Sequence, residues 1–351
     1  MDHDNPFFQD RTPRKVFLKK DIFFLFLLTI GIVLHLYLFF AANVEQDKEL
    51  SCFQEYVHDK IFNPEDESLQ AQTTLGLFLI ALFSIGLSVN FFLFIFFILD
   101  RQGARRLLFP FYDAKRETLF EIKDILYLII FGYFTTQIFR SVFSWIRMKS
   151  FFSPDALFIL NLISGTLVLQ LVVLFFLFLY SFETYHQTPR YLAVPRKNIF
   201  RKLSATAFLF LAMFPWIFLL ALFGLMISQK FNIPVRSHAI TDYIIKNRLD
   251  FSSFYMIAYA VLGAPFFEEI IFRGFVYTTI RKHWGITSGL IVTSIIFSLF
   301  HMNFLQFFYI FGLGVALALV YEATSSLWFS IFLHSINNAM ALLLTFLLKY
   351  H

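Results

Sequence analysis

Long apolar runs are the feature of this sequence that most restricts how the chain can fold. Crossing a bilayer takes roughly 20 residues, and apolar runs near or above this length occur at about 22–42, 74–99, 120–139, 156–182, 204–228, 252–280, 287–303, 304–322 and 327–348. Hydrophobic residues make up 58% of the chain and charged residues 15%, too little polar surface for a soluble globule. The sequence therefore predicts an all-α integral membrane protein, a bundle of eight to nine transmembrane helices.

The basic residues between these runs predict the orientation of the chain. One alternating set of polar segments holds fifteen Lys and Arg and the other holds nine; the sets are 1–21, 100–119 and 183–203 against 43–73, 140–155 and 229–250. Cytoplasmic loops carry an excess of basic residues, so the N-terminus is predicted to be cytoplasmic. The net charge of +5 is spread over short runs rather than one face, which argues against nucleic acid as a partner.

The chain divides into three predicted parts. Residues 1–21 form a cytoplasmic N-terminal segment, 22–250 form an N-terminal transmembrane region of about five spans, and ionisable residues interrupt the apolar runs of 251–348. The single cysteine, Cys52, excludes an intramolecular disulfide and any multi-cysteine metal site. Polar residues inside the early spans have no predicted partner and are interpreted as packing residues: His35, Asn90 and Gln170.

Two acids and a base interrupt the apolar run that begins near residue 252. The segment Pro265–Phe275 contains Glu268, Glu269 and Arg273, and charged side chains in a membrane helix are costly enough to be informative. Glu269 and Arg273 share a helix face at i,i+4, where they can pair, while Glu268 points elsewhere. We therefore expect Arg273 to neutralise Glu269 and Glu268 to be free to act as a general base.

A histidine in the next run is expected at the same depth as Glu268. The polar break at His283–Gly285 predicts a helical hairpin. The number of residues from Glu268 to Gly285 is almost the same as the number from Gly285 to His301. Antiparallel helices that rise about 1.5 Å per residue bring two such side chains to nearly the same level. The spacing therefore predicts that Glu268 and His301 meet.

The last apolar run carries two polar side chains on one helix face. His334 and Asn338 are spaced i,i+4, and as neutral donors they can bind the oxyanion that develops at a peptide carbonyl. Their depth relative to His301 stays open, because counting residues does not fix the ends of the intervening helix. Asn303 and Glu322 lie close to these motifs and could line a cavity, but loop polarity is the simpler interpretation.

Three motifs thus follow one another in the last third of the chain. They read Glu-Glu-x-x-x-Arg from Glu268, Phe-x-x-x-His up to His301, and His-x-x-x-Asn from His334. Together they resemble the type II CAAX protease-like members of the CAAX prenyl protease and bacteriocin-processing family, also called Abi proteins. The resemblance covers about 251–348, and it implies a CAAX-protease-like catalytic core in a helical bundle that encloses a polar, water-accessible intramembrane cavity.

The resemblance also implies a reaction and a role for each residue. Glu268 and His301 would activate a water molecule for attack on a peptide bond, His334 and Asn338 would stabilise the oxyanion, and the Glu269 ion pair would support the site. Family members that process CAAX proteins act after prenylation, on the cytoplasmic side, whereas bacterial relatives are linked to bacteriocin maturation and self-immunity. We expect a metal-free endopeptidase of a bacterial plasma (inner) membrane, whose partners are the lipid bilayer and a membrane-associated peptide or protein substrate.

Two alternatives stay open at this level. Glu, His and His are plausible zinc ligands, so a metal-dependent form of the same peptidase is the nearest rival, although the zincin signature His-Glu-x-x-His is absent and Asn is a poor zinc ligand. A non-catalytic scaffold or a transporter would use the charges as structural ion pairs or as substrate sites. The lack of internal repeats counts against transport. No motif encodes the substrate or the oligomeric state.

Overall fold

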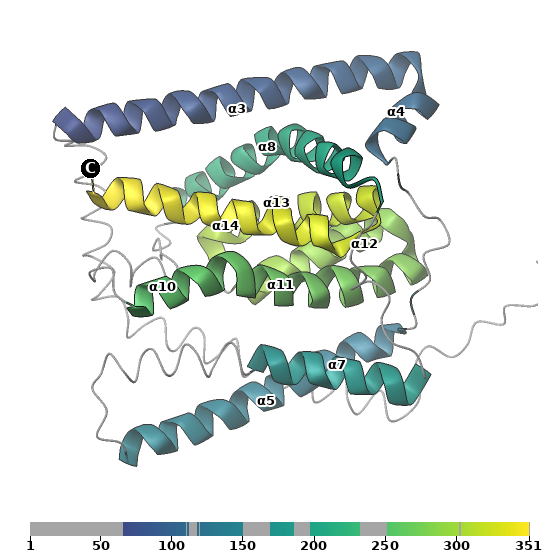
Figure 1. Cartoon of the computed structure of the whole chain (residues 1–351), viewed down its shortest axis with the longest axis vertical. Helices are drawn as coiled ribbons and strands as arrows, with labels where there is room; N and C mark the ends of the chain where they lie inside the picture. Colours follow the sequence, from purple (N-terminus) through teal and green to yellow (C-terminus); the bar gives the residue numbers. More distant parts are fainter. Residues whose placement is uncertain are drawn as a thin grey trace, which may run out of the picture.

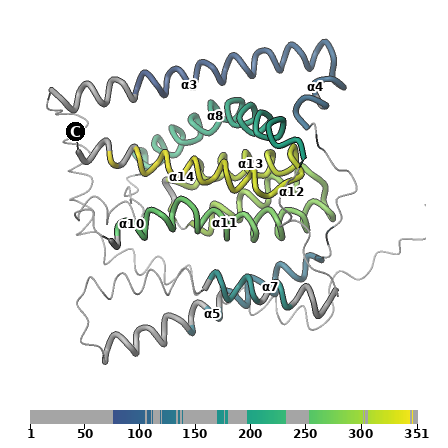
Figure 2. Tube along the Cα trace, in the orientation of Figure 1, coloured from purple at the N-terminus to yellow at the C-terminus, as the bar shows by residue number. Residues whose placement is uncertain are grey.

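The computed structural model describes residues 66–109, 111, 118, 120–149, 169–185, 197–231, 251–301 and 303–350, and all regular elements in these ranges are helices. Figure 1 shows α3 along one edge of the bundle and the α5/α7 pair along the opposite edge, with α8 and the C-terminal helices between them. Figure 2 traces the same arrangement along the chain. The predicted first span at 22–42 and the N-terminal segment 1–21 lie outside the described residues.

The helices of the N-terminal transmembrane region follow the predicted apolar runs, with different ends. They are α3 (Asp66–Leu99), α4 (Arg101–Leu108), α5 (Ile122–Lys149), α7 (Leu169–Tyr185) and α8 (Ile199–Lys230). Helix α5 continues well beyond the apolar run at 120–139, because a helix does not have to end where hydrophobicity ends. The part of the fourth run before residue 169 lies outside the described residues.

The C-terminal region contains the hairpin that the sequence predicts. Its elements are α10 (Phe251–Ala258), the π-helical segment η4 (Tyr259–Gly263), α11 (Ala264–Glu269), the π-helical segment η5 (Ile270–Tyr277), α12 (Thr278–Phe300), α13 (Phe304–Thr324) and α14 (Leu327–Tyr350). Helical geometry breaks inside α12 at Gly285, where φ is 83° and ψ is 176°. Beyond this break the chain folds back on itself, so that Phe297 packs edge-on against Phe272 with ring centroids 5.0 Å apart.

Four helices within the described residues are long and apolar enough to cross a membrane: Gly76–Leu99, Ile199–Lys230, Ser253–Phe300 and Gln306–Thr324. The stretch Ser253–Phe300 counts as one apolar unit, although Gly285 divides it into the two arms of the hairpin. Large apolar side chains of α3 face outward, among them Phe91, Phe92 and Phe94, as expected when lipid replaces water around a helix. The chain is therefore an integral, multi-pass membrane protein, and the expected total of eight to nine spans stays a prediction.

Three apolar clusters hold the helices around the hairpin. Phe120, just before α5, and Ile125 within it pack with Val173 and Leu177 of α7 on Phe275 and its neighbours in η5. A second cluster joins α8, α13 and α14 through residues such as Leu209, Leu317 and Phe329. A third joins η5, α13 and α14 through Tyr277, Tyr321 and Leu327. The hairpin and α13 are thus covered on several sides, whereas α3 contacts mainly α8.

Asn90 and Gln170 have partners that the sequence did not indicate. Asn90 Nδ2 on α3 donates to the carbonyl oxygen of Ala212 on α8 at 2.8 Å, and the Trp216 indole donates to Asn90 Oδ1 at 3.3 Å. The Tyr259 hydroxyl donates to Gln170 Oε1 at 2.7 Å. The packing interpretation was therefore wrong for both residues: they form interhelical hydrogen bonds, which satisfy polar groups that lipid cannot.

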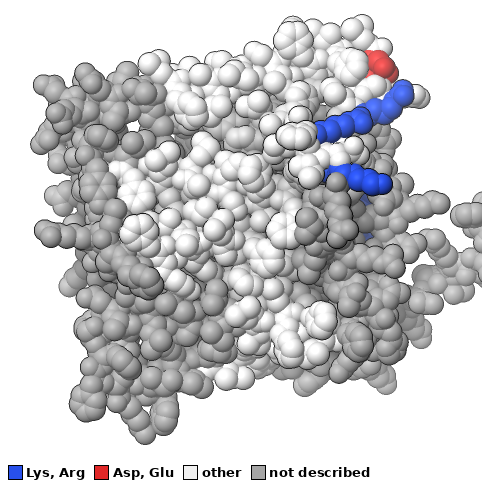
Figure 3. All heavy atoms as spheres, in the orientation of Figure 1, with Lys and Arg blue, Asp and Glu red and all other residues white. Residues whose placement is uncertain are grey.

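Basic residues gather at the end of the bundle that holds α4 and the Gly285 break. Figure 3 shows Lys and Arg side chains at this edge. Arg201 and Lys202 lie over the Phe111 ring at 5.4 and 5.1 Å from its centroid, and Lys282 pairs with Glu121 at 2.9 Å. Burial raises the pKa of Glu121, but hydrogen bonds and charges from Lys282 and His283 outweigh it and lower that pKa. Segments that the sequence assigns to the cytoplasmic set therefore meet at one end.

Helices α12 and α13 approach each other closely at Gly314. A Cβ atom there would lie 3.0 Å from Ser294 Cβ and 3.2 Å from Ser294 Cα, whereas a Cβ at Gly132 in α5 would have nothing within 4 Å. We expect Gly314→Ala to lower the free energy of unfolding by about 1–3 kcal/mol, because the two helices must separate. Gly132→Ala is the matched control and should be neutral or stabilising by about 0.5–1 kcal/mol. Thermal unfolding in detergent would measure both, and equal effects would contradict the close contact.

Candidate active site

The two adjacent acids of α11 lie in opposite environments, as the sequence predicts. Glu269 is fully buried, while the Glu268 side chain keeps 23% of its surface exposed. The π-helical segments η4 and η5 flank α11. Such wider turns change the direction in which the following side chains point, and they occur often at functional sites. The local backbone therefore separates the two carboxylates.

Glu269 is the centre of a buried polar cluster. Its Oε1 pairs with Arg273 Nη1 at 2.7 Å, both side chains being fully buried, and Oε1 also contacts His334 Nδ1 at 2.9 Å. Its Oε2 accepts a hydrogen bond from the Ser330 hydroxyl at 2.6 Å. The predicted pairing of Glu269 with Arg273 is confirmed. Ser330 was missed, although its i,i+4 spacing to His334 places both on the same helix face.

Arg273 extends the cluster to the neighbouring helices. Its Nη2 donates to the carbonyl oxygen of Gly314 at 3.2 Å, and its guanidinium lies over the Phe297 ring, 4.4 Å from the centroid. A side chain at Gly314 would meet Ser294, so the glycine lets α13 come close to the hairpin. One arginine thus joins η5, α12 and α13.

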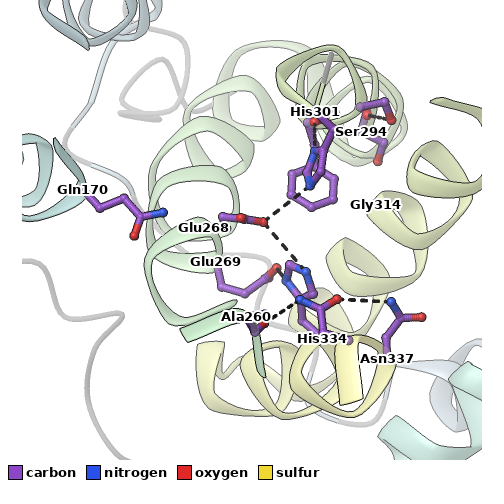
Figure 4. Close-up of polar contacts among 12 residues, drawn as sticks. Gln170, Ala260, Glu268, Glu269, Ser294, His301, Gly314, His334 and Asn337 are labelled. Carbon is purple, nitrogen blue, oxygen red and sulfur yellow. Dashed lines mark hydrogen bonds and ion pairs between the residues drawn. The ribbon is translucent and has the colours of Figure 1, made fainter. Parts of the chain in front are cut away.

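Glu268 faces two histidines, as Figure 4 shows. Its Oε2 lies 3.9 Å from His301 Nε2 and 3.8 Å from His334 Nε2. These distances are too long for direct hydrogen bonds, and Oε2 has no hydrogen-bond partner among the described residues. The predicted meeting of Glu268 and His301 is confirmed, and the depth of His334, which residue counting left open, matches theirs.

Each histidine has one ring nitrogen fixed by an acceptor. His301 Nδ1 lies 2.9 Å from the carbonyl oxygen of Phe297, so Nδ1 carries the proton and Nε2 presents a lone pair toward Glu268. His334 Nδ1 likewise donates to Glu269. A donor role for His334 Nε2 therefore requires a proton on both ring nitrogens, which is the imidazolium form rather than the neutral donor expected from the sequence.

Asn338 is tied to the backbone of η4 rather than left free. Its Nδ2 donates to the carbonyl oxygen of Ala260 at 2.9 Å, and its Oδ1 accepts from Asn337 Nδ2 at 3.4 Å. One of the two amide hydrogens is thus occupied. The other stays available for the predicted oxyanion role, on the same face of α14 as His334.

The interpretation of Glu322 as loop polarity was wrong. Glu322 lies inside α13 and is fully buried, and its carboxylate pairs with Arg281 at 2.9 Å and accepts from the Tyr277 hydroxyl at 2.9 Å. Asn303 caps the N-terminus of α13 by accepting from the Gln306 backbone N–H at 3.2 Å. Glu322 therefore forms a second buried ion pair, between the active-site cluster and the basic end.

The three side chains that face one another at the candidate site are also of types that bind metal ions. Glu268, His301 and His334 are of the ligand types that zinc prefers. Among the described residues, however, no group of three or more His, Cys, Asp or Glu is arranged so that it could hold a metal ion. We therefore derive no reaction step through a metal.

Arg273→Met should strongly destabilise the protein, by about 3–5 kcal/mol, because it leaves the Glu269 carboxylate buried and uncompensated. The double variant with Glu269→Gln should recover part of this loss, since the buried charge is then gone. Lys282→Met is the control: Lys282 belongs to a largely exposed ion pair, which contributes at most about 1 kcal/mol. Thermal unfolding in detergent measures all three, and a double variant no more stable than Arg273→Met would contradict the role assigned to the pair.

Comparison with known families places the whole candidate site within one matched range. Residues 250–340 match the family model described as type II CAAX prenyl endopeptidase Rce1-like. The comparisons with curated proteins and with solved structures found no match to the chain. The matched range contains both arms of the hairpin, α13 and the part of α14 with His334 and Asn338. Residues 250–340 of this multi-pass membrane protein are therefore similar to the Rce1-like type II CAAX prenyl endopeptidases, a family of peptidases.

Proposed function

We propose that the protein is an intramembrane endopeptidase in which Glu268 and His301 activate a water molecule. The observation that carries this proposal is the 3.9 Å separation of two acceptors, Glu268 Oε2 and His301 Nε2. Two acceptors repel each other directly, but a water molecule about 2.8 Å from both can donate one hydrogen to each. Its oxygen lone pair then points away from both acceptors, toward a peptide carbonyl.

The remaining residues support the later steps. As water attacks the carbonyl carbon, one of its protons passes to Glu268, which then protonates the leaving amine. The carbonyl oxygen gains negative charge, and His334 in its imidazolium form and the second amide hydrogen of Asn338 stabilise it. Glu269 holds the His334 ring through Nδ1, so that its position is set before substrate binds.

The depth of the site limits the class of substrate. Glu268 lies midway along the chain between Phe251 and Gly285, with roughly 25 Å of helix on either side at about 1.5 Å per residue. A scissile bond must therefore reach the interior of the bilayer. This favours membrane-associated substrates, either prenylated CAAX-type peptides or bacteriocin and leader peptides.

A zinc-dependent form of the peptidase is the second candidate, because Glu268 faces two histidines. The absence of the zincin signature His-Glu-x-x-His and the weakness of Asn as a zinc ligand favour the metal-free scheme. A transporter or a non-catalytic scaffold is less well supported, because the chain has no internal repeats and residues 250–340 match a peptidase family.

Glu268→Gln should reduce cleavage at least about 100-fold, because an amide cannot accept the proton of water. The fold should be retained, since Glu268 Oε2 makes no hydrogen bond within the described part of the chain that could be lost. The assay uses purified protein in nanodiscs with a farnesylated CAAX peptide and a panel of unprenylated hydrophobic peptides. Glu121→Gln, the same substitution at the basic end, should leave the rate unchanged.

Two results would contradict the mechanism. Undiminished cleavage by Glu268→Gln would remove the proposed base, and loss of activity on exhaustive chelation with recovery on adding zinc would favour the metal-dependent form. Cleavage that survives chelation, in protein without metal by elemental analysis, is the expected outcome.

We further propose that the basic end faces the cytoplasm, which places residues 43–73 on the outer side. Cys52 lies in this outer segment and is the single cysteine, so an impermeant maleimide should label it in intact cells. In a Cys52→Ser background, Trp284→Cys beside the Gly285 break should be labelled only after permeabilisation. The reverse pattern would invert the topology.

A further inference from the structure

The sequence removes the π-helical backbone donor that the carbonyl oxygen of Ala260 would otherwise accept from. In η4 the hydrogen bonds run from residue i to residue i+5, as the Ala264 N–H to Tyr259 carbonyl bond shows. The residue five positions after Ala260 is Pro265, which has no N–H to donate. Because a carbonyl without a donor is costly in a membrane even when it is only partly buried, a side chain that supplies one is favoured.

Asn338 supplies this donor, and its orientation is thereby fixed. A carbonyl oxygen only accepts, so the contact of 2.9 Å requires the NH₂ side of the amide to face Ala260. The Oδ1 atom is then turned toward Asn337 Nδ2, 3.4 Å away. The amide cannot flip without losing both bonds.

A tyrosine on another helix completes the chain of hydrogen bonds. The Tyr309 hydroxyl on α13 donates to Asn337 Oδ1 at 2.6 Å. This bond turns Asn337 Nδ2 toward Asn338, so one polar chain joins α13, α14 and η4. Tyr309 lies outside the three sequence motifs, and Asn337 occupies an unspecified position within the third.

We propose that Tyr309 and Asn337 are positioning residues that hold the Asn338 amide with its second hydrogen directed to the carbonyl oxygen of the scissile bond. This inference rests on the proposed function. Each member satisfies one group of the next, so a change at Tyr309 reaches the substrate only through Asn338. A chain that served only to join helices would contribute to stability and leave the chemical step unchanged.

The test compares two tyrosines that differ in one respect. The Tyr309 hydroxyl donates to Asn337, whereas the buried Tyr255 hydroxyl of α10 has no hydrogen-bond partner among the residues that the structure describes. Tyr309→Phe should lower kcat about threefold to tenfold with little change in KM, as expected for loss of one neutral hydrogen bond that orients a donor. Tyr255→Phe should leave kcat unchanged. Asn338→Ala should lower kcat by about 100-fold or more.

A double-mutant cycle separates positioning from stability. In the Asn338→Ala background, Tyr309→Phe should have no further effect on kcat, because the residue it positions is gone. A further loss of the same size in that background would overturn the proposal, and so would equal effects of Tyr309→Phe and Tyr255→Phe. Glu268→Gln is assayed in parallel. If this variant loses cleavage while the Tyr309 variants do not behave as expected, only the positioning role fails and the proposed function holds.

A spectroscopic readout is independent of cleavage. In protein labelled with ¹⁵N-asparagine in nanodiscs, the Asn338 side-chain NH₂ signals are identified by their loss in Asn338→Asp. Tyr309→Phe should shift these signals and Tyr255→Phe should not. Unshifted signals in Tyr309→Phe would contradict the chain of hydrogen bonds even if no tested peptide is cleaved.

Discussion

The buried carboxylate of Glu269 is the interaction on which the site depends. Three groups from two chain segments meet it: Arg273, Ser330 and His334. In a medium of low dielectric each of these bonds is strong, and losing any of them leaves a polar group without water to replace it. Because Arg273 also bonds the backbone of α13, the cluster fixes the hairpin, α13 and α14 in one relative position.

This arrangement explains why two adjacent acids have different fates. Glu269 forms the ion pair with Arg273 and accepts the hydrogen bonds of the cluster. The Oε2 atom of Glu268 has no hydrogen-bond partner in the described ranges. An unsatisfied acceptor is unfavourable for folding and useful for catalysis, since it can bind a proton only from water or substrate. In the proposed mechanism, the stability of the cluster around Glu269 compensates for the unpaired acceptor of its neighbour Glu268.

The sequence predicted those contacts that depend on helix periodicity and counting. Glu269 with Arg273 follows from i,i+4 spacing, and Glu268 with His301 follows from nearly equal distances to Gly285. The sequence did not predict contacts that depend on tertiary packing or on irregular backbone. Glu322 was mistaken for loop polarity because its partner Arg281 lies on another helix, far from it in the sequence. The bond of Asn338 to Ala260 exists because η4 is π-helical, and periodicity assumes regular helices.

The break at Gly285 has a consequence for how the protein assembles. Glu268 and His301 lie on the two arms of one hairpin, so they can meet as soon as that hairpin enters the bilayer. Contacts at short sequence separation form early because little chain entropy is lost. His334 and Asn338 arrive later, with α14. In the proposed mechanism, the pair that activates water is therefore assembled before the pair that stabilises the oxyanion.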